Sequence, residues 1–320
     1  MAAITNFEQL RAEAKRRGPL TVAVAAAQQY SSIEAAREAC DAGIANAILV
    51  GDEEQIRKIA AENAVSLDGL RVIDVPEVHE AAREAVRLVH DGTAQILMKG
   101  KLETADLLRA ALNKEAGLRA GALLTVVWVG EIPGFGRLLF ISDPGVVIRP
   151  TIDQKVDIVQ NAINVALRLG LIEPKVAVLA ALDMVSPTIP TTVDAANLSK
   201  MADRGQITGG YVDGPLGFDT AISPAAALAH GLRGPVAGQA DILIVPDIEA
   251  GNVLVKGLTY FAGAASAVIV AGARAPIVIT SRADPPETKL TSIALAALLA
   301  SSPLPLHETI LTLADVQQRS

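Results

Sequence analysis

Residues 276–290, PIVITSRADPPETKL, hold the densest group of side chains that could do chemistry. An apolar, β-rich run ends in Ser281 and Arg282, and Asp284 and Glu287 flank two prolines before a helical pattern begins. Where the carboxyl end of a strand meets the start of a helix, free N–H groups favour an anion. A hydroxyl, a guanidinium and two carboxylates could bind phosphate there and also move a proton. The alternative interpretation is an ordinary capped helix with a solvated, charged first turn.

A second polar segment, VPDIEAGNVLVKG, follows another apolar run at residues 245–257. The predicted strand ends in Asp247 and Glu249, and a helix is expected to start around Gly251 and Asn252. Asn252 could cap this helix, with Lys256 one turn later. We predict that these side chains lie at the carboxyl end of a strand and contact the substrate.

Four further residues are weaker candidates for substrate binding. In VDGPLGFDTAISP, glycines and a proline predict a tight turn that presents Asp213. Lys99 follows a predicted strand and could face a phosphate, or it could be a solvated lysine. Asp143 and Arg149 flank a predicted domain boundary, where Arg149 could be a second anion ligand or part of a surface ion pair.

The first half of the chain alternates between short apolar runs and longer amphipathic ones. This pattern predicts βα units, with strands at 21–27, 47–50, 72–75 and 96–98 and helices at 31–42, 53–63, 77–90 and 104–115. Connections this short favour parallel strands with right-handed crossovers and a three-layer α/β/α sandwich. Apolar runs at 122–129 and 137–141, joined by EIPGFG, predict a hairpin.

The second half predicts another βα series. A long helix at 151–169 precedes strands near 176–180, 209–212, 242–245 and 267–270. The expected fold is therefore α/β, with two three-layer domains, mainly parallel sheets and an active-site cleft between the domains. We predict that one domain comprises residues 1–145 plus 273–320 and that residues 146–272 form the inserted second domain, because the last strand at 276–280 needs a sheet to join.

Composition restricts the classes of function. Of the 320 residues, 51% are hydrophobic and 3% aromatic, as expected for a core of Ala, Val, Ile and Leu around buried parallel strands. A formal charge of −7 argues against a general nucleic-acid binder. Cys40 is the only cysteine, which excludes an intrachain disulfide and a cysteine zinc site. No signal peptide or membrane span is predicted, so we expect a cytoplasmic protein.

The sequence resembles the phosphate acetyl/butyryltransferase family over nearly its whole length, and most closely the butyryltransferase branch. The resemblance rests on five ordered blocks: MKGKLETADLLRAAL (98–112), ISDPGVVIRPTIDQK (141–155), VDGPLGFDTAIS (212–223), AGQADILIVPDIEAGNVLVK (237–256) and PIVITSR (276–282). It implies reversible transfer of a short acyl group, such as acetyl or butyryl, between coenzyme A and inorganic phosphate. It also implies a fold like that of the isocitrate and isopropylmalate dehydrogenases, a homodimer, and no metal or organic cofactor.

The resemblance also assigns roles to individual residues. The Ser-Arg pair that binds acyl phosphate in the acetyl branch aligns with Ser281 and Arg282, and the Asp-x-x-x-Gly-Asn block of that branch falls on residues 247–252. The catalytic Asp of that branch is replaced by Thr288, which cannot act as a base at neutral pH. Glu287 and Asp284 are the nearby substitutes, with Glu287 closer in register. Chemistry without a dedicated base is the third possibility.

Two other functions compete with acyl transfer. A metal- and NAD-dependent dehydrogenase of the isopropylmalate or hydroxythreonine-phosphate type shares the expected architecture, and the chain has carboxylates that could serve as metal ligands. A non-catalytic relative that senses small molecules would explain the missing aspartate. The retention of Ser281, Arg282, Asp247 and Asn252 together argues against loss of catalysis.

Overall fold

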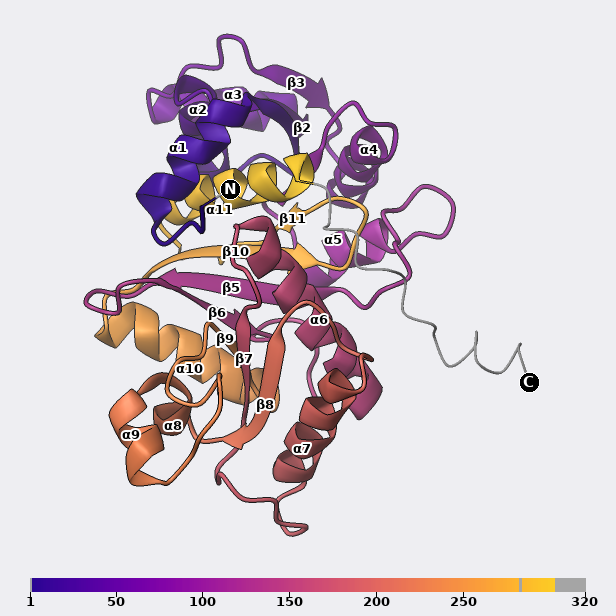
Figure 1. Cartoon of the computed structure of the whole chain (residues 1–320). Coiled ribbons are helices and arrows are strands. Elements are labelled where there is room, and N and C mark those ends of the chain that lie inside the picture. The colour runs from indigo at the N-terminus through magenta and orange to yellow at the C-terminus, as the bar shows by residue number, and fades with distance from the viewer. Residues whose placement is uncertain (1, 282–283, 303–320) are drawn as a thin grey trace.

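The alternating strands and helices form one mixed sheet covered by helices on both faces (Figure 1). The computed structural model describes residues 2–281 and 284–302. The strands are β1 (Leu20–Ala25), β2 (Ala45–Gly51), β3 (Arg71–Asp74), β4 (Ile96–Lys99), β5 (Thr125–Glu131), β6 (Leu138–Ser142), β7 (Lys175–Leu179), β8 (Tyr211–Leu216), β9 (Ile242–Ile244), β10 (Ala265–Ala271) and β11 (Ile277–Val278). Their order across the sheet is β3-β2-β1-β4-β11-β10-β5-β6-β9-β7-β8.

Most strand pairs are parallel, as the short βα connections predicted. The exceptions lie at the centre of the sheet, where β10 is antiparallel to both β11 and β5, and β5 and β6 form the predicted antiparallel hairpin. The α/β class with a mainly parallel sheet is therefore confirmed. The final strand, β11, pairs in parallel with β4 of the first half. The eleven strands form a continuous sheet, and the division into two domains at residues 145 and 273 stays a prediction.

Alternating side chains on each strand supply two opposite cores. In β1, Val22 and Val24 pack into one core, whereas Ala23 and Ala25 pack into the other. The first core is covered by α1 (Phe7–Arg17), α2 (Tyr30–Asp41), α3 (Glu53–Glu62), α6 (Ile152–Arg168), α7 (Pro190–Asp203) and α11 (Pro286–Ser301).

The opposite face carries two separate hydrophobic clusters. One lies under α4 (Val78–His90) and α5 (Thr104–Ala111), and the other lies under α8 (Phe218–Ile222), α9 (Pro224–Ala229) and α10 (Ile248–Phe261). On β5, Val126 belongs to the first cluster and Trp128 to the second. The middle of this face therefore lies at the junction between two groups of helices.

The start of α10 corrects one expectation from the sequence. The helix begins at Ile248, and its N-cap is Asp247, whose Oδ1 accepts a hydrogen bond from the Ala250 N–H at 2.9 Å. The prediction that Asn252 caps the helix is therefore wrong, because Asn252 lies inside it.

No helix of the described residues is long and apolar enough to cross a membrane.

Candidate active site

A cavity of about 400 Å³ lies between α10 and the turn that follows β11. Its apolar lining includes Val126 and Trp128 of β5 and Val268 of β10, so it lies where the two hydrophobic clusters of this face meet. Polar groups reach it from both halves of the chain. They are Thr104, Asn252, Lys256, Thr259, Tyr260, Ser266, Thr280, Ser281 and Asp284.

One face of α10 forms a wall of this cavity. The lining residues are Asn252, Val255, Lys256, Thr259 and Tyr260, a spacing that places them on a single helix face. Capping by Asp247 five residues before Asn252 fixes where this face begins. The structure therefore brings two predicted site residues, Asn252 and Lys256, to the cavity.

The opposite wall is a tight turn closed by its own hydrogen bonds. The Ser281 N–H donates to Asp284 Oδ2 at 2.7 Å, and the Asp284 N–H donates to the Ser281 carbonyl at 3.2 Å. Lys289 of α11 donates from Nζ to the same Ser281 carbonyl at 3.1 Å. Lys289 is buried, and burial lowers the pKa of its ammonium while the charge of Asp284 opposes that shift. Lys289 is thus a positioning residue that sequence reasoning did not assign to the site.

The two carboxylates proposed as the base lie in different places. Asp284 lines the cavity, whereas Glu287 is absent from its lining and forms an ion pair with Arg11 of α1 at 3.5 Å. The Glu287 side chain is 73% exposed. The ranking of Glu287 ahead of Asp284 is therefore not supported by their positions. Arg282 lies outside the described residues.

Two predicted site residues hold α10 and the hairpin together. Gly251 is buried, and a Cβ at this position would lie 2.8 Å from Pro144 Cα and 2.8 Å from Val245 Cγ2. Asp143 is 3% exposed, and its carboxylate accepts four backbone N–H groups, from Val126, Gly145, Val146 and Val147, at 2.7–3.3 Å. Burial raises the pKa of the Asp143 carboxyl, and these four donors oppose that shift. Both residues therefore position the site, and the Asp143 carboxylate is already saturated with donors.

The remaining predicted residues are not part of the cavity lining. Lys99 is buried, and its Nζ donates to the carbonyls of Gly100 and Leu102 at 3.4 and 3.2 Å. Asp213 lies on β8 at the far edge of the sheet, and its Oδ1 accepts the Gly214 N–H at 2.8 Å. The side chains of Arg149 and Glu249 are exposed near the start of α10.

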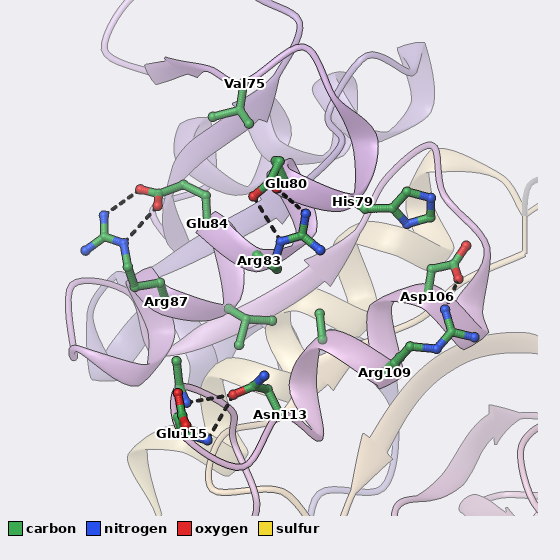
Figure 2. Close-up of a pocket in the computed structure, with 13 residues that line it drawn as sticks. Val75, His79, Glu80, Arg83, Glu84, Arg87, Asp106, Arg109, Asn113 and Glu115 are labelled. Atoms are coloured by element: carbon green, nitrogen blue, oxygen red, sulfur yellow. Dashed lines mark hydrogen bonds and ion pairs between the residues drawn. The ribbon is translucent and has the colours of Figure 1, made fainter.

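A larger cavity of about 840 Å³ lies between α4 and α5 on the same face of the sheet (Figure 2). Its arginines are paired with carboxylates three residues earlier on the same helix, as in Arg87 with Glu84 at 2.6 Å and Arg109 with Asp106 at 2.5 Å. Exposed pairs of this kind neutralise each other's charge. The smaller cavity is the better candidate, because it contains several of the residues that the sequence selected independently.

Some lining residues were not assigned to the site from the sequence. Thr104, Tyr260 and Ser266 come from three separate elements, and only the fold brings them together. The helical spacing from Asn252 onward would have suggested Tyr260.

Among residues 2–281 and 284–302, no group of three or more His, Cys, Asp or Glu side chains could hold a metal ion.

The fold is that of an α/β protein with a cavity of mixed polar and apolar lining, and comparison with known proteins specifies the family. The family described as phosphate acetyl/butaryl transferase matches residues 6–86 and 75–297, and the chain belongs to it. A phosphate butyryltransferase of Clostridium acetobutylicum is 46% identical over 93% of this chain and 99% of its own length. A phosphate acetyltransferase of Rhizobium meliloti is 45% identical over 93% of this chain and 94% of its own length.

Solved structures agree with the family. A branched-chain phosphotransacylase from Enterococcus faecalis has a TM-score of 0.78 at 32% identity and covers 88% of this chain and 99% of its own. A phosphotransacetylase from Streptococcus pyogenes, at 20% identity, has the same fold with a TM-score of 0.79 and covers 92% of this chain and 99% of its own. The predicted resemblance and the predicted class of enzyme, a phosphate acyltransferase, are confirmed. The dehydrogenase and non-catalytic alternatives are not favoured.

Proposed function

We propose that this chain transfers a short acyl group reversibly between coenzyme A and inorganic phosphate in the cavity beside α10. The observation that carries the proposal is that Ser281, Asp284, Asn252 and Lys256 share one space with an apolar floor. An acyl phosphate has an anionic end and an alkyl end, so it needs both kinds of surface. Family membership supports the reaction, and the cavity supports its location.

The reaction requires a proton acceptor and stabilisation of developing charge. In the direction that forms acyl-CoA, the coenzyme A sulfur attacks the carbonyl carbon, the bond from that carbon to the phosphate oxygen breaks, and phosphate leaves with the electron pair. A free thiol has a pKa of about 8.5, so a base that accepts its proton assists the attack. We assign this role to Asp284, because it is the one carboxylate among the described residues that line the cavity.

Ser281 and Lys256 bind the reacting groups in this proposal. The Ser281 hydroxyl can donate to the carbonyl oxygen as negative charge develops on it, and the Lys256 ammonium can pair with phosphate oxygens. Arg282 keeps the phosphate-binding role implied by its alignment. Coenzyme A is a substrate, and the proposal includes neither a metal nor an organic cofactor.

The test is an assay of acyl-CoA cleavage by the purified chain. We expect release of the coenzyme A thiol to depend on inorganic phosphate for at least one acyl group between acetyl and valeryl, without added divalent metal. One methylene contributes only about 1–3 kcal/mol to discrimination in an apolar pocket. The values of kcat/KM for acyl groups that differ by one methylene should therefore differ by no more than about 200-fold. Absence of phosphate-dependent cleavage for every acyl group would contradict the proposal.

A further inference from the structure

A second cavity lies on the opposite face of β10 from the candidate active site. It has a volume of about 310 Å³ and lies between α6, the end of α11 and the loop that joins β10 to β11. Ile269, Val270 and Ala271, at the end of β10, line it, whereas Ser266 and Val268 line the active-site cavity. The two cavities lie under different helices, since α6 and α11 cover one face of the sheet and α10 covers the other. We call this second space the rear cavity.

Arg168, the last residue of α6, is the unusual group in the rear cavity. Its side chain is partly buried, and its Nε is fully buried without a hydrogen-bond partner among the described residues. Burial lowers the pKa of this guanidinium, and no charged group opposes the shift. Arginine nevertheless stays protonated in proteins. Within residues 2–281 and 284–302, this partly desolvated positive charge has no counter-charge, which is costly unless a ligand supplies one.

Three other polar side chains of helices and loops also line the rear cavity. Arg274 lines it from the β10–β11 loop, and Asn161 and Asn164 line it from α6. Neither Asp nor Glu is among the described lining residues. Asn164 Oδ1 accepts from Gln160 Nε2 at 3.1 Å, which leaves the amide nitrogen of Asn164 as a donor. Asn161 Nδ2 already donates to the Leu123 carbonyl and to Thr125 Oγ1, at 2.9 and 3.0 Å, so it offers no further donor. Arg168, Arg274 and the Asn164 amide nitrogen are therefore the groups that can donate to an anion.

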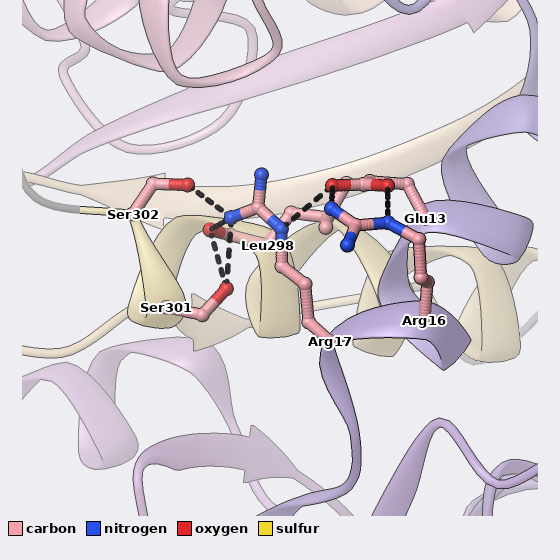
Figure 3. Close-up of polar contacts among 6 residues, drawn as sticks. All are labelled: Glu13, Arg16, Arg17, Leu298, Ser301 and Ser302. Carbon is pink, nitrogen blue, oxygen red and sulfur yellow. Dashed lines mark hydrogen bonds and ion pairs between the residues drawn. The ribbon is translucent and has the colours of Figure 1, made fainter. Parts of the chain in front are cut away.

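A neighbouring arginine, Arg17, shows that side chains in this region can supply hydrogen-bond partners to an arginine that has a structural role. Arg17 of α1 donates from Nε to Glu13 at 2.9 Å and from Nη1 to Ser301 Oγ at 3.0 Å, and it also contacts Ser302 (Figure 3). These contacts fasten α1 to the end of α11. In the part of the chain that the structure describes, Arg168 has no comparable set of partners, although Ser302 also borders its cavity.

We propose that the rear cavity is a binding site for a diffusible oxyanion of the phosphate or carboxylate class, held between Arg168 and Arg274. A guanidinium presents paired N–H donors that match two oxygens of such an anion. Carboxylates of the chain's own C-terminal segment, at Glu308 and Asp315, have the same chemistry and are the competing occupant. The site is independent of the acyl-transfer proposal.

The experiment is a titration of the full chain with inorganic phosphate, followed by the NMR signal of the Arg168 Nε–Hε group. Arg168→Gln assigns the signal by its loss. We expect the signal to shift saturably with phosphate but not with sodium chloride at equal ionic strength. Arg274→Gln should weaken this binding at least about tenfold, the effect of losing one charge-assisted contact. Arg57→Gln, which removes an exposed arginine paired with Glu53 at 2.6 Å on α3, should leave it unchanged.

Three results would overturn the inference. The first is a signal that does not shift saturably with phosphate. The second is a phosphate affinity that Arg274→Gln leaves unaltered, which would place the anion elsewhere. The third is a signal that moves in the double variant Glu308→Gln/Asp315→Asn without added anion, which would assign the site to the chain's own carboxylates. An unchanged titration in that double variant supports the diffusible anion.

Discussion

Asp284 and Glu287 are three residues apart, yet only Asp284 lines the candidate active site. The sequence shows that both carboxylates are present, but it does not show where they point. Pro286 starts α11, and Glu287 in its first turn faces Arg11 of α1. Asp284 remains in the turn, hydrogen-bonded to Ser281. Residue types could be predicted here, whereas side-chain direction depends on the packing of α11 against α1.

Asp143 gives a prediction about stability at the scale of one residue. Either oxygen of its carboxylate accepts two backbone N–H groups, so Asp143→Asn must leave two buried donors facing an amide nitrogen. We expect the free energy of unfolding to fall by about 2–4 kcal/mol. Urea denaturation of both proteins measures the difference.

The matched control for this change is Asp153→Asn. Asp153 is an exposed acid in the first turn of α6, where a carboxylate interacts with the helix dipole by about 0.3–1 kcal/mol. Equal losses of stability in the two variants would show that the hydrogen bonds of Asp143 have no special role.

At the scale of elements, α10 shows why helix boundaries are hard to read from sequence. Asp247 and Asn252 are both good N-cap residues, and Gly251 between them has a poor propensity for a helix interior. The helix nevertheless continues through Gly251, and the position requires glycine because the backbone of Pro144 lies too close for any Cβ. That contact joins segments more than 100 residues apart, so local pattern could not reveal it.

The same contact predicts a difference between two glycines of α10. Gly251→Ala should reduce stability by about 1–3 kcal/mol, because its Cβ would meet Pro144 and Val245 at 2.8 Å, and it should lower activity by displacing Asn252 and Lys256. Gly257→Ala meets nothing within 4 Å and should stabilise the helix by up to about 1 kcal/mol. Thermal unfolding and turnover of both variants test this, and equal effects would contradict it.

At the scale of the whole molecule, the parallel strands were predictable and the centre of the sheet was not. Short βα connections restrict neighbouring strands to a few arrangements, which explains why the first four strands and the hairpin agree with prediction. The antiparallel pairing of β10 with β5 joins residues more than 130 positions apart and reverses the expected direction of β10. This pairing forms the floor of the candidate active site and also separates it from the rear cavity.

A homodimer and a cytoplasmic location stay predictions.

The most direct test of the central claim is the rate of phosphate-dependent butyryl-CoA cleavage in Asp284→Asn beside Glu287→Gln. Both substitutions remove one carboxylate from the same short segment, but only Asp284 lines the cavity. We expect Asp284→Asn to lower kcat by at least about a hundredfold, the usual contribution of a positioned general base. Glu287→Gln should stay within about threefold of the parent chain, because an exposed ion pair contributes about 0–1 kcal/mol. A large loss in Glu287→Gln with little change in Asp284→Asn would contradict the assignment of the active site.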